Sequence, residues 1–334
     1  MKIDIVYTYV DGNDSNWRKK KSEHEKLLLG IELNAGNEAR YMDNQELKYS
    51  LRSVEMFAPW VNKIFIVTDK QVPEWLNLTN SKIKIIDHTE IFSDVNVLPN
   101  FNAKAIETQI HHIKELSEYF IYFNDDMFLG RPTKATNFFS EVGKPKIFVS
   151  EIFAFPSPKA FQYENRKSSR KNDYQESVIN TRILFREKFR KSVYYNIRHG
   201  VKPLLKSTLF ELENIFSEEV YRTAKNKFRS GKDLMMFHLC QFYCLGNKIG
   251  KAVYLKSIGN DSFLNKIISR IWKDKSFGFI NLDNSNLDNF LKQINEARPF
   301  VFCLNQTPST PENNLVLMKQ FLDSYFPEKS SFEK

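Results

Sequence analysis

Two adjacent carboxylates, Asp125 and Asp126, follow the apolar run Phe120–Phe123 and Asn124. Like charges side by side repel each other, and a hard divalent cation such as Mg²⁺ or Mn²⁺, which prefers oxygen ligands, relieves that repulsion. A cation held there can in turn bind a diphosphate. A turn whose Asn and Asp side chains only cap the backbone explains the same residues. The motif therefore predicts a metal and phosphate site, with a polar turn as the alternative.

A histidine and an arginine in the second half of the chain are candidates for proton transfer and phosphate binding. His199 lies in the basic, turn-rich segment Arg198–Pro203, and cationic neighbours favour the neutral imidazole that can accept a proton. Arg229 precedes a helix expected from about Asp233 to Leu245, where its guanidinium and the first free N–H groups can hold one phosphate. A solvated side chain is the simpler alternative for both residues.

The turn after the first predicted strand offers a second kind of site. Asp11 and Asp14 supply carboxylates there, and Gly12 between them is free to adopt a positive φ angle. Such backbone and carboxylate groups can hydrogen-bond a nucleobase or a ribose. An ordinary loop after an ordinary strand explains these residues equally well. The weaker candidates elsewhere are His88, His111 and His112.

The first 130 residues alternate β-rich runs with helical patterns, which predicts parallel strands joined by right-handed crossovers. Asp43 and Glu46 have capping-box spacing for one helix, which Pro59 ends. Asn102 is the expected cap of another helix, whose apolar stripe reaches Ile113. Because the carboxyl ends of parallel strands form the ligand-binding edge of an open sheet, polar residues there are candidates. The predicted strands are Ile3–Val10, Lys63–Thr68, Ile83–Ile86 and Phe120–Phe123, and Asp11, Asp69, His88 and Asp125 follow them.

The pattern becomes less regular after Arg131. We expect a loop or lid at Lys159–Asp173, late strands at Ala252–Lys256 and Phe300–Leu304, and a final helix before the charged tail. The predicted fold class is therefore α/β, with a mostly parallel, Rossmann-like sheet flanked by helices and a mixed helical C-terminal part.

Charge is unevenly distributed along the chain. Residues 1–130 carry 15 Lys and Arg against 20 Asp and Glu, a net charge of −5, so the rest of this chain of net charge +9 carries +14. Thirteen basic and four acidic residues lie between Lys159 and Lys206. Such a segment suits a polyanionic acceptor, diphosphate groups or an anionic membrane surface better than nucleic acid. A solvated basic face without a partner is the alternative.

Other bulk features limit the class of protein. The chain of 334 residues, 42% of them hydrophobic, can bury a large core. It contains no apolar run of membrane-spanning length, and its start lacks the pattern of a signal peptide, so we expect a cytoplasmic protein. Cys240, Cys244 and Cys303 lack the spacing of a zinc site and are expected to be reduced thiols. P-loop, G-x-G-x-x-G and G-x-S-x-G motifs are absent, which argues against P-loop kinases, dinucleotide oxidoreductases and the usual serine hydrolases.

Taken together, these segments resemble the Stealth family of capsule-polymer phosphotransferases, whose animal relative is the lysosomal-enzyme N-acetylglucosamine-1-phosphotransferase. The likeness lies in four sequence blocks, which follow one another in the same order as in that family. It implies a glycosyltransferase-A-like core, a UDP-sugar donor and a divalent cation, Mg²⁺ or Mn²⁺. The blocks are Ile3–Asp14 (IDIVYTYVDGND), Arg40–Phe128 (from RYMDNQELKYSLRSVEMFAPWVNKIFIVTD to YFNDDMF), His199–Leu204 with Lys227–Ser230 (KFRS), and Phe302–Asn305 (FCLN).

The resemblance implies a role for each candidate residue. Asp125 and Asp126 would hold the metal and take part in catalysis, with His199 as the active-site histidine and Arg229 as the phosphate-contacting arginine. Residues 1–130 would form the half that binds the nucleotide sugar, and residues 131–334 would bind the acceptor and complete the catalytic site in one integrated domain. The expected ligands of the nucleotide sugar are Asp11, Gly12, Asp14, Arg52, Asn124 and Asn305.

The implied reaction transfers hexose-1-phosphate, an N-acetylhexosamine-1-phosphate in particular, from the UDP-sugar to a hydroxyl of an anionic oligosaccharide or polysaccharide, releasing UMP. The resemblance also implies peripheral contact with the membrane or the capsule assembly machinery. It implies no nucleic-acid partner. The rivals are a metal-dependent glycosyltransferase that releases UDP and an inactive glycan-binding assembly protein. Two departures from the family stand out: Gln306 follows Asn305 where an acidic residue is usual, and Gly200 and Val201 delay the proline after His199.

Overall fold

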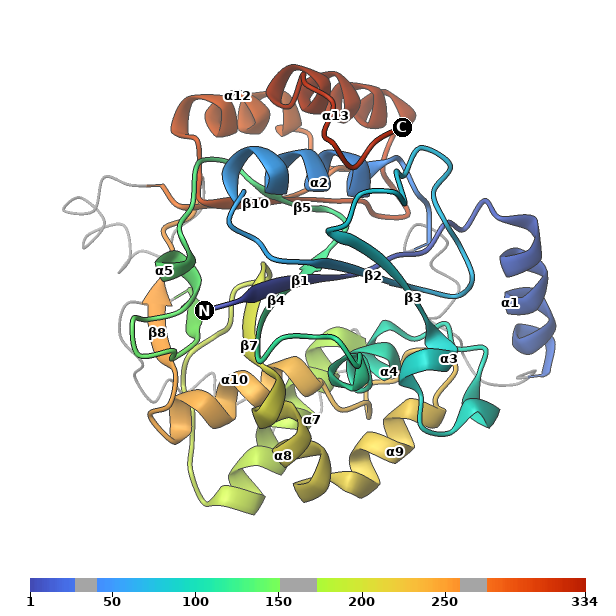
Figure 1. Cartoon of the computed structure of the whole chain (residues 1–334), viewed down its shortest axis with the longest axis vertical. Helices are drawn as coiled ribbons and strands as arrows, with labels where there is room; N and C mark the ends of the chain where they lie inside the picture. Colours follow the sequence, from blue (N-terminus) through green and yellow to red (C-terminus); the bar gives the residue numbers. More distant parts are fainter. Residues whose placement is uncertain (28–40, 151–172, 259–274) are drawn as a thin grey trace.

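The computed structural model describes residues 1–27, 41–150, 173–258 and 275–334. Its central sheet consists of β1 (Ile3–Thr8), β2 (Ile64–Thr68), β3 (Ile83–Asp87), β4 (Tyr119–Asn124) and β7 (Lys202–Leu205). The strand order is β3-β2-β1-β4-β7 (Figure 1). The first four strands are mutually parallel, whereas β7 runs antiparallel beside β4. The predicted mostly parallel sheet is therefore confirmed, and β7 is an edge strand that the sequence pattern did not predict.

The central strands are buried on both faces. Side chains alternate along β1, so that Ile5 and Tyr7 enter one hydrophobic core and Val6 enters the other. Every residue of β2 is buried as well. Strands covered on both faces are continuously apolar, which is why the pattern of the first 130 residues predicted them well.

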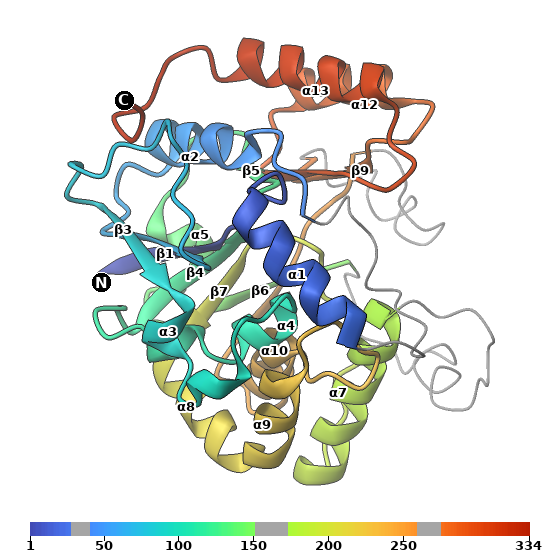
Figure 2. The ribbon, with the colours of Figure 1, turned by 90° about the vertical axis from the view of Figure 1, so that its right-hand side faces the viewer.

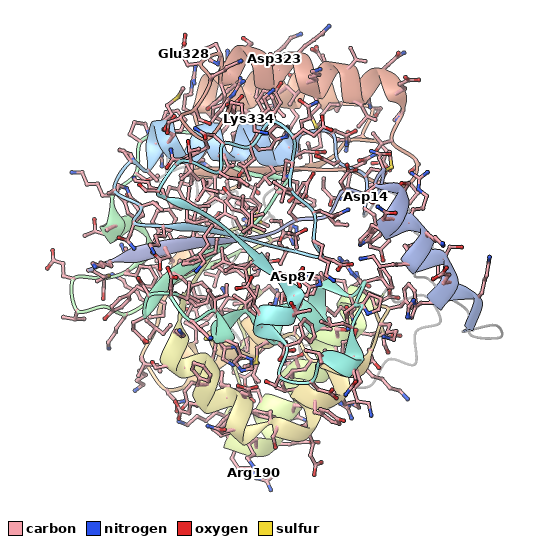
Figure 3. The ribbon with its side chains drawn as sticks, turned by 45° about the vertical axis from the view of Figure 1, so that its right-hand side comes forward. Asp14, Asp87, Arg190, Asp323, Glu328 and Lys334 are labelled. Atoms are coloured by element: carbon pink, nitrogen blue, oxygen red, sulfur yellow. The ribbon has the colours of Figure 1, made fainter. Side chains whose placement is uncertain are left out.

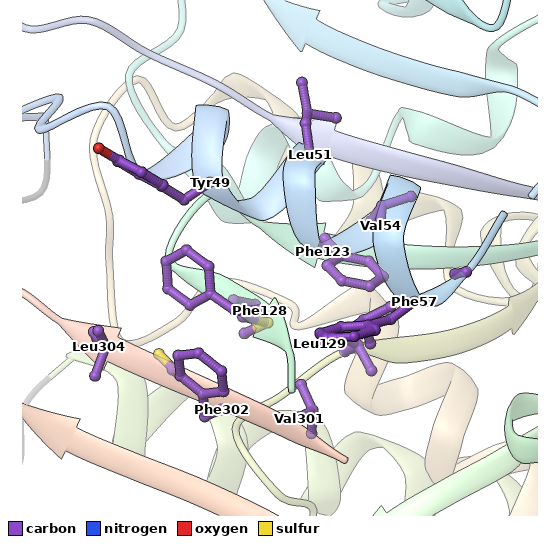
Figure 4. Packing of buried hydrophobic residues seen from close by; sticks show 14 of the residues in the cluster. Tyr49, Leu51, Val54, Phe57, Phe123, Phe128, Leu129, Val301, Phe302 and Leu304 are labelled. Atoms are coloured by element: carbon purple, nitrogen blue, oxygen red, sulfur yellow. The ribbon is translucent and has the colours of Figure 1, made fainter. Parts of the chain in front are cut away.

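One face of the sheet is covered by helices and a second, smaller sheet. Its helices are α2 (Glu46–Phe57), α12 (Leu287–Ala297) and α13 (Glu312–Tyr325), and its strands are β5 (Met127–Leu129), β10 (Val301–Asn305) and β9 (Phe277–Asn281), in the order β5-β10-β9. Figure 4 shows Val54 and Phe57 of α2 in the same buried cluster as Phe123 and Phe128. The rings of Phe128 and Phe302 stack with centroids 5.1 Å apart, joining β5 to β10.

The opposite face is covered mainly by helices, which lie below the sheet in Figure 1 and again in Figure 2. They are α3 (His88–Ile91), α4 (Ala103–Glu107), α7 (Asp173–Phe189), α8 (Lys206–Ile215), α9 (Ser217–Lys225) and α10 (Met236–Gly246). The remaining elements are α1 (Ser15–Leu27), α5 (Ala135–Phe138), the parallel pair β6 (Lys146–Val149) and β8 (Lys251–Tyr254), and two 3₁₀ turns, Val95–Val97 and Ile110–His112.

Three helix starts test the expected caps. Asn102 caps α4 by accepting from the N–H of Lys104, as predicted, although the helix ends at Glu107 and a 3₁₀ turn continues the apolar stripe. The predicted capping box of α2 is wrong, because the residue before that helix is Gln45 in the left-handed region, with a φ of 66°. The predicted start of α10 at Asp233 is also wrong, since that helix begins at Met236.

The two halves of the chain share both sheets. β7 pairs with β4, and β10 pairs with β5, so residues after 130 complete sheets that earlier residues begin. The late strands β8 and β10 and the final helix α13 lie close to their predicted places. The predicted loop at Lys159–Asp173 falls almost wholly outside the described residues. None of the described helices combines the length and the apolar character needed to cross a membrane, and the cytoplasmic location stays a prediction.

Candidate active site

The candidate site lies at the carboxyl ends of β1 and β4, which pair in parallel with Thr8 opposite Asn124. Asn124 ends β4, and Asp125 and Asp126 form the turn into β5, where all three side chains are partly buried. The N–H of Asp126 donates to Oδ1 of Asp125 at 3.1 Å. The turn therefore holds both carboxylates at the carboxyl edge of the sheet, where the sequence predicted them.

Asp126 is only half satisfied by the protein around it. Its Oδ2 accepts from the thiol of Cys303 on β10, with a distance of 3.1 Å between sulfur and oxygen. Its Oδ1 is buried and finds no hydrogen-bond partner among the described residues. A buried carboxylate oxygen without a partner carries a desolvation cost. A cation at this oxygen would remove that cost.

Four carboxylates, Asp43, Glu46, Asp125 and Asp126, make up what we call the acidic group. Burial, and then repulsion by Asp126, Glu46 and Asp43, raises the pKa of Asp125 well above its ordinary value. Burial likewise raises the pKa of Asp126 to about 6 and that of Glu46 to about 7. Positive charge close by would favour the ionised forms of all four. The crowded carboxylates and the unpartnered oxygen of Asp126 therefore fit a divalent cation.

Beside these acids lies a second set, Lys202, Arg229 and His199, which we call the basic group. Lys202 begins β7, is buried, and has its Nζ 5.1 Å from the ring centre of Tyr122. Burial, followed by repulsion from Lys202 and Arg229, lowers the pKa of His199 to about 3. The imidazole is therefore neutral near pH 7 and able to accept a proton. This is the form predicted from its cationic neighbours.

Glu107 lies against the basic group without being one of its three members. Sequence reasoning did not identify this residue. It is the last residue of α4, and burial raises its pKa, against the attraction of Lys202, Arg229 and Lys104 and a hydrogen bond with Tyr122. The signal available in the sequence was weak: an acidic residue next to the apolar stripe of a predicted helix. Only the antiparallel return of β7 brings Lys202 close to it.

Arg229 lies near His199, but not at a helix N-terminus as predicted. It lies seven residues before α10, so it does not share a phosphate site with the first turn of that helix. Ser230 and Asp233 instead bond to each other, from the Ser230 N–H to Oδ2 of Asp233 at 2.7 Å. Arg229 nonetheless acts electrostatically on His199 and on Glu107. The structure thus brings Arg229 to His199, while the predicted helix-terminus geometry is wrong.

The turn after β1 has mainly structural contacts. Asp14 caps α1, since its Oδ1 accepts from the N–H groups of Asn16 at 2.8 Å and Trp17 at 3.0 Å (Figure 3). These bonds lower its pKa, that from Trp17 most. Gly12 does not use the freedom to adopt a positive φ angle. A side chain there would overlap the carbonyl of Tyr41, which accepts from the Gly12 N–H. Nucleotide binding by Asp11, Gly12 and Asp14 stays a prediction.

Arg52, a predicted ligand of the nucleotide sugar, has structural contacts among the described residues. Its side chain is buried, and its Nε and Nη2 each donate to a carboxylate oxygen of Glu333 at 2.8 Å. Its Nη1 donates to the carbonyl of Phe326, also at 2.8 Å. This bidentate pair fastens the end of the chain to α2. Glu333 lies 281 residues further on, where no local pattern reveals it, and a role of Arg52 at the nucleotide sugar stays a prediction.

Asn305 and Gln306 lie at the end of β10, next to the acidic group. The amide of Asn305 donates to Oδ1 of Asn281 at 2.8 Å. Gln306, at the position where the resemblance led us to expect an acid, accepts from Nδ2 of Asn44 at 2.7 Å. The same nitrogen donates to Oε1 of Glu46 at 2.8 Å. Gln306 thus contacts the acidic group through Asn44, without adding charge to it.

Several predicted groups lie elsewhere or are turned inward. Arg182 and Lys202 of the basic segment do not form a solvated face, because Arg182 donates to backbone carbonyls of Val193 and Tyr195 and Lys202 is buried. Cys240 and Cys244 are free, buried thiols of α10, as expected. The imidazoles of His111 and His112 both contact Oε2 of Glu213, and the Nδ1 of His88 is buried without a described partner.

Models of three conserved regions match the chain in order: Stealth protein conserved region 2 at residues 40–147, region 3 at 198–245 and region 4 at 292–334. The capsular polysaccharide phosphotransferase fcs1 of Haemophilus influenzae is 36% identical over 96% of this chain and 81% of its own length. This chain belongs to the Stealth family. The acidic group lies in region 2, the basic group in region 3 and Cys303 in region 4.

Two further Stealth relatives differ in how much of their length is matched. The receptor polysaccharide phosphotransferase WefC of Streptococcus gordonii is 31% identical over 99% of both chains. An exopolysaccharide phosphotransferase of Streptomyces coelicolor is 34% identical over 99% of this chain but only 51% of its own length. The chain thus spans about half the length of that relative. In relatives of this kind, a large part of the protein lies outside the match.

Solved structures of glycosyltransferases resemble the fold loosely. The galactosyltransferase LgtC, solved with donor and acceptor sugar analogs, has a TM-score of 0.44 at 11% identity, and covers 98% of this chain and 96% of its own. GlyE of Streptococcus pneumoniae TIGR4 has a TM-score of 0.40 at 12% identity, over all of this chain and 65% of its own. These values concern the fold alone.

Proposed function

We propose that this Stealth chain transfers a sugar-1-phosphate, an N-acetylhexosamine-1-phosphate in particular, from a UDP-sugar to a hydroxyl of a polysaccharide, releasing UMP. The observation that carries the proposal is the contact between two charge sets. The acidic group crowds four carboxylates, and Oδ1 of Asp126 has no partner among the described residues. The basic group faces it with two positive side chains and a neutral histidine. A diphosphate bound with a cation would complete both sets. The relatives named as polysaccharide phosphotransferases support the reaction type.

The reaction would be a single in-line displacement at phosphorus, in which the chain's own residues take part. The acceptor oxygen forms a bond to the sugar-proximal phosphorus, and the bond from that phosphorus to the bridging oxygen breaks, so that UMP leaves with the bridging oxygen. His199 takes the proton of the acceptor hydroxyl. Its low pKa arises partly from Lys202 and Arg229, and the negative charge of a bound diphosphate would offset these two cations. The basicity of His199 thus rises when the substrate is present.

The other site residues would bind and orient. Arg229 and Lys202 would stabilise the charge on the transferred phosphoryl group. Asp125 and Asp126 would hold a Mg²⁺ or Mn²⁺ ion, which when bound neutralises charge on the diphosphate. Residues 1–130 would bind the donor, and residues 131–334 would supply His199, Lys202 and Arg229 and contact the acceptor. Peripheral contact with a membrane or with assembly machinery remains part of the same proposal.

Analysis of the released nucleotide tests the reaction. The protein is incubated with Mg²⁺, UDP-N-acetylhexosamines and a capsule oligosaccharide, and the nucleotides are separated. UMP together with a phosphodiester-linked product is expected, and both should be lost in Asp125→Ala. Release of UDP with a product free of phosphorus would mean attack at the anomeric carbon, as in a glycosyltransferase, and would refute the proposal. Acceptor binding without turnover, unchanged in Asp125→Ala, would indicate an inactive glycan-binding protein.

A further inference from the structure

Three potential metal ligands of different chemistry converge within the candidate site. They are the carboxylate of Asp126 after β4, the imidazole of His199 before β7 and the thiol of Cys303 in β10. One ligand atom from each lies within 4.8 Å of the other two. The Cys303 sulfur and Oδ2 of Asp126 are already 3.1 Å apart, and Oδ1 of Asp126 has no described hydrogen-bond partner.

This ligand set favours a softer cation than the one expected for the diphosphate. Mg²⁺ takes oxygen ligands in near-octahedral geometry, whereas carboxylate, imidazole and thiolate together are ligands of Zn²⁺. Zinc bonds of about 2.0–2.3 Å place tetrahedral ligand atoms roughly 3.3–3.8 Å apart. Side chains whose ligand atoms lie within 4.8 Å need only small rotations to reach that spacing. The fourth position would remain open to water.

We propose that Asp126, His199 and Cys303 form a Zn²⁺ site, and that Zn²⁺ bound there blocks the transfer reaction. Binding would displace the proton of the Cys303 thiol to solvent as the sulfur–zinc bond forms. It would occupy the proton acceptor His199 and one of the two carboxylates assigned to the catalytic cation. The binding part stands on these three residues alone, while the inhibition part rests on the proposed function.

Another His and acid cluster in the described residues provides a contrast. The Nε2 atoms of His111 and His112 lie 2.7 and 2.9 Å from the same oxygen of Glu213, which are ordinary hydrogen-bond lengths. The Nδ1 of His112 also lies 2.8 Å from the carbonyl of Ile91. Protons between these atoms therefore explain the cluster without a metal. It contains no thiol, so any metal bound there would give a different spectrum from the site at Cys303.

Cobalt is the probe that separates the two clusters. Co²⁺ is titrated into the full chain without substrate, and thiolate-to-cobalt charge transfer is followed in the near ultraviolet. We expect a saturable band at one equivalent, lost in Cys303→Ser and retained in Cys240→Ala and in His112→Gln. Zn²⁺ added afterwards should abolish the band, because it replaces Co²⁺. A wild-type protein without the band, or a band that survives in folded Cys303→Ser, would overturn the site.

Inhibition is measured separately from binding. Transfer is assayed with saturating Mg²⁺ and increasing Zn²⁺, and each variant is compared with its own rate without Zn²⁺. The half-inhibiting Zn²⁺ concentration should rise at least about tenfold in Cys303→Ser, since losing even an outer-shell partner costs a metal site that much. Full transfer with Zn²⁺ bound would refute the block. If the protein binds Co²⁺ as expected but releases no UMP from any donor, the proposed metal site stands and the proposed function is refuted.

Discussion

The acidic and basic groups of the site are opposite in charge and also differ in how the chain builds them. All four acids lie within residues 43–126, and burial, followed by repulsion from the other three carboxylates, raises the pKa of Asp125. The basic group comes from residues 199–229, and its cations are partly compensated by Glu107. The acidic group therefore needs a cation more strongly than the basic group needs an anion.

This difference indicates an order of assembly. A cation at Asp125 and Asp126 would relieve repulsion that the protein itself leaves in place, whereas Lys202 already attracts Asp126 across the boundary of the two groups. A nucleotide diphosphate, which is an anion, is attracted to the acidic group only after the cation has bound. The comparison thus predicts that loss of an acid removes activity most, and that changes in the basic group have smaller effects.

The largest effect is expected for Asp126→Asn. The substitution removes the carboxylate assigned to the cation and should lower kcat by roughly 10³-fold, the upper range for loss of one electrostatic group. It should also raise the unfolding free energy of the metal-free protein above pH 7, because burial raises the pKa of Asp126 to about 6 and its ionised form therefore destabilises the fold there. Enzyme kinetics and chemical denaturation of the same samples measure both. Asp323→Asn on α13, an acid that accepts from Tyr49, is the control and should change neither kcat nor the cation requirement. Activity retained by Asp126→Asn would remove this acid from the proposed cation site.

Arg229→Ala should have the next largest effect. Loss of one cation from the transferred phosphoryl group should reduce kcat/KM about 10²-fold. The reduction should be smaller than that for Asp126→Asn, because Lys202 remains. Lys225→Ala is the matched control, since this exposed lysine at the end of α9 contacts only the ring of Tyr221 among the described cation–ring pairs. Steady-state kinetics would contradict the assignment if both variants lost the same activity.

Sequence patterns predicted the position of Asp125 and Asp126 well because its determinants are local, whereas Asp43 and Glu46 had been assigned only to a helix cap. A buried parallel strand is continuously apolar, so the end of β4 and the carboxylates after it are visible in residues 120–126. The cap at Asn102 depended on one nearby side chain and was also correct. β1 and β4 pair in parallel, and Asp11 and Asp125, each expected after the end of a strand, therefore follow neighbouring strands.

Long-range partners set the parts that could not be predicted. β7 is only four residues long and contains a proline, so its antiparallel pairing with β4, and with it the position of Lys202 near Glu107, leaves no local pattern. Arg52 looked like a ligand because its partner Glu333 is at the far end of the chain. Gly12 was noted for its freedom to adopt a positive φ angle, whereas the close approach of the Tyr41 backbone is what restricts this position. In each case the deciding contact lies far away in sequence.

A smaller effect, on the dependence of stability on pH, should identify His199. Its pKa is lowered from 6.5 to about 3 in the folded protein, so the unfolded chain binds a proton there first as the pH falls. The stability contributed by the neutral imidazole is present above pH 6.5 and is lost as the pH falls toward 3. The raised pKa values of Asp125 and Asp126 act in the opposite direction, so the wild type is compared with His199→Gln. Between pH 7 and pH 4, the melting temperature of the wild type should fall by more than that of His199→Gln. Equal falls in the two proteins would show that His199 is not buried as a neutral base.

Gln306→Glu should have the smallest effect and tests the acidic group by adding to it. The new carboxylate would accept the same bond from Nδ2 of Asn44 that Gln306 accepts now, next to Glu46, whose pKa is already about 7. One more negative charge should strengthen cation binding about two- to fivefold, as expected for 0.5–1 kcal/mol from a partly exposed charge. The half-saturating Mg²⁺ concentration for transfer should fall accordingly, and the metal-free protein should unfold more easily above pH 7. Gln306→Leu removes the hydrogen bond without adding charge and should not tighten Mg²⁺ binding. Equal Mg²⁺ requirements in wild type and Gln306→Glu would mean that charge near Glu46 does not reach the cation, which would confine the cation site to the turn after β4.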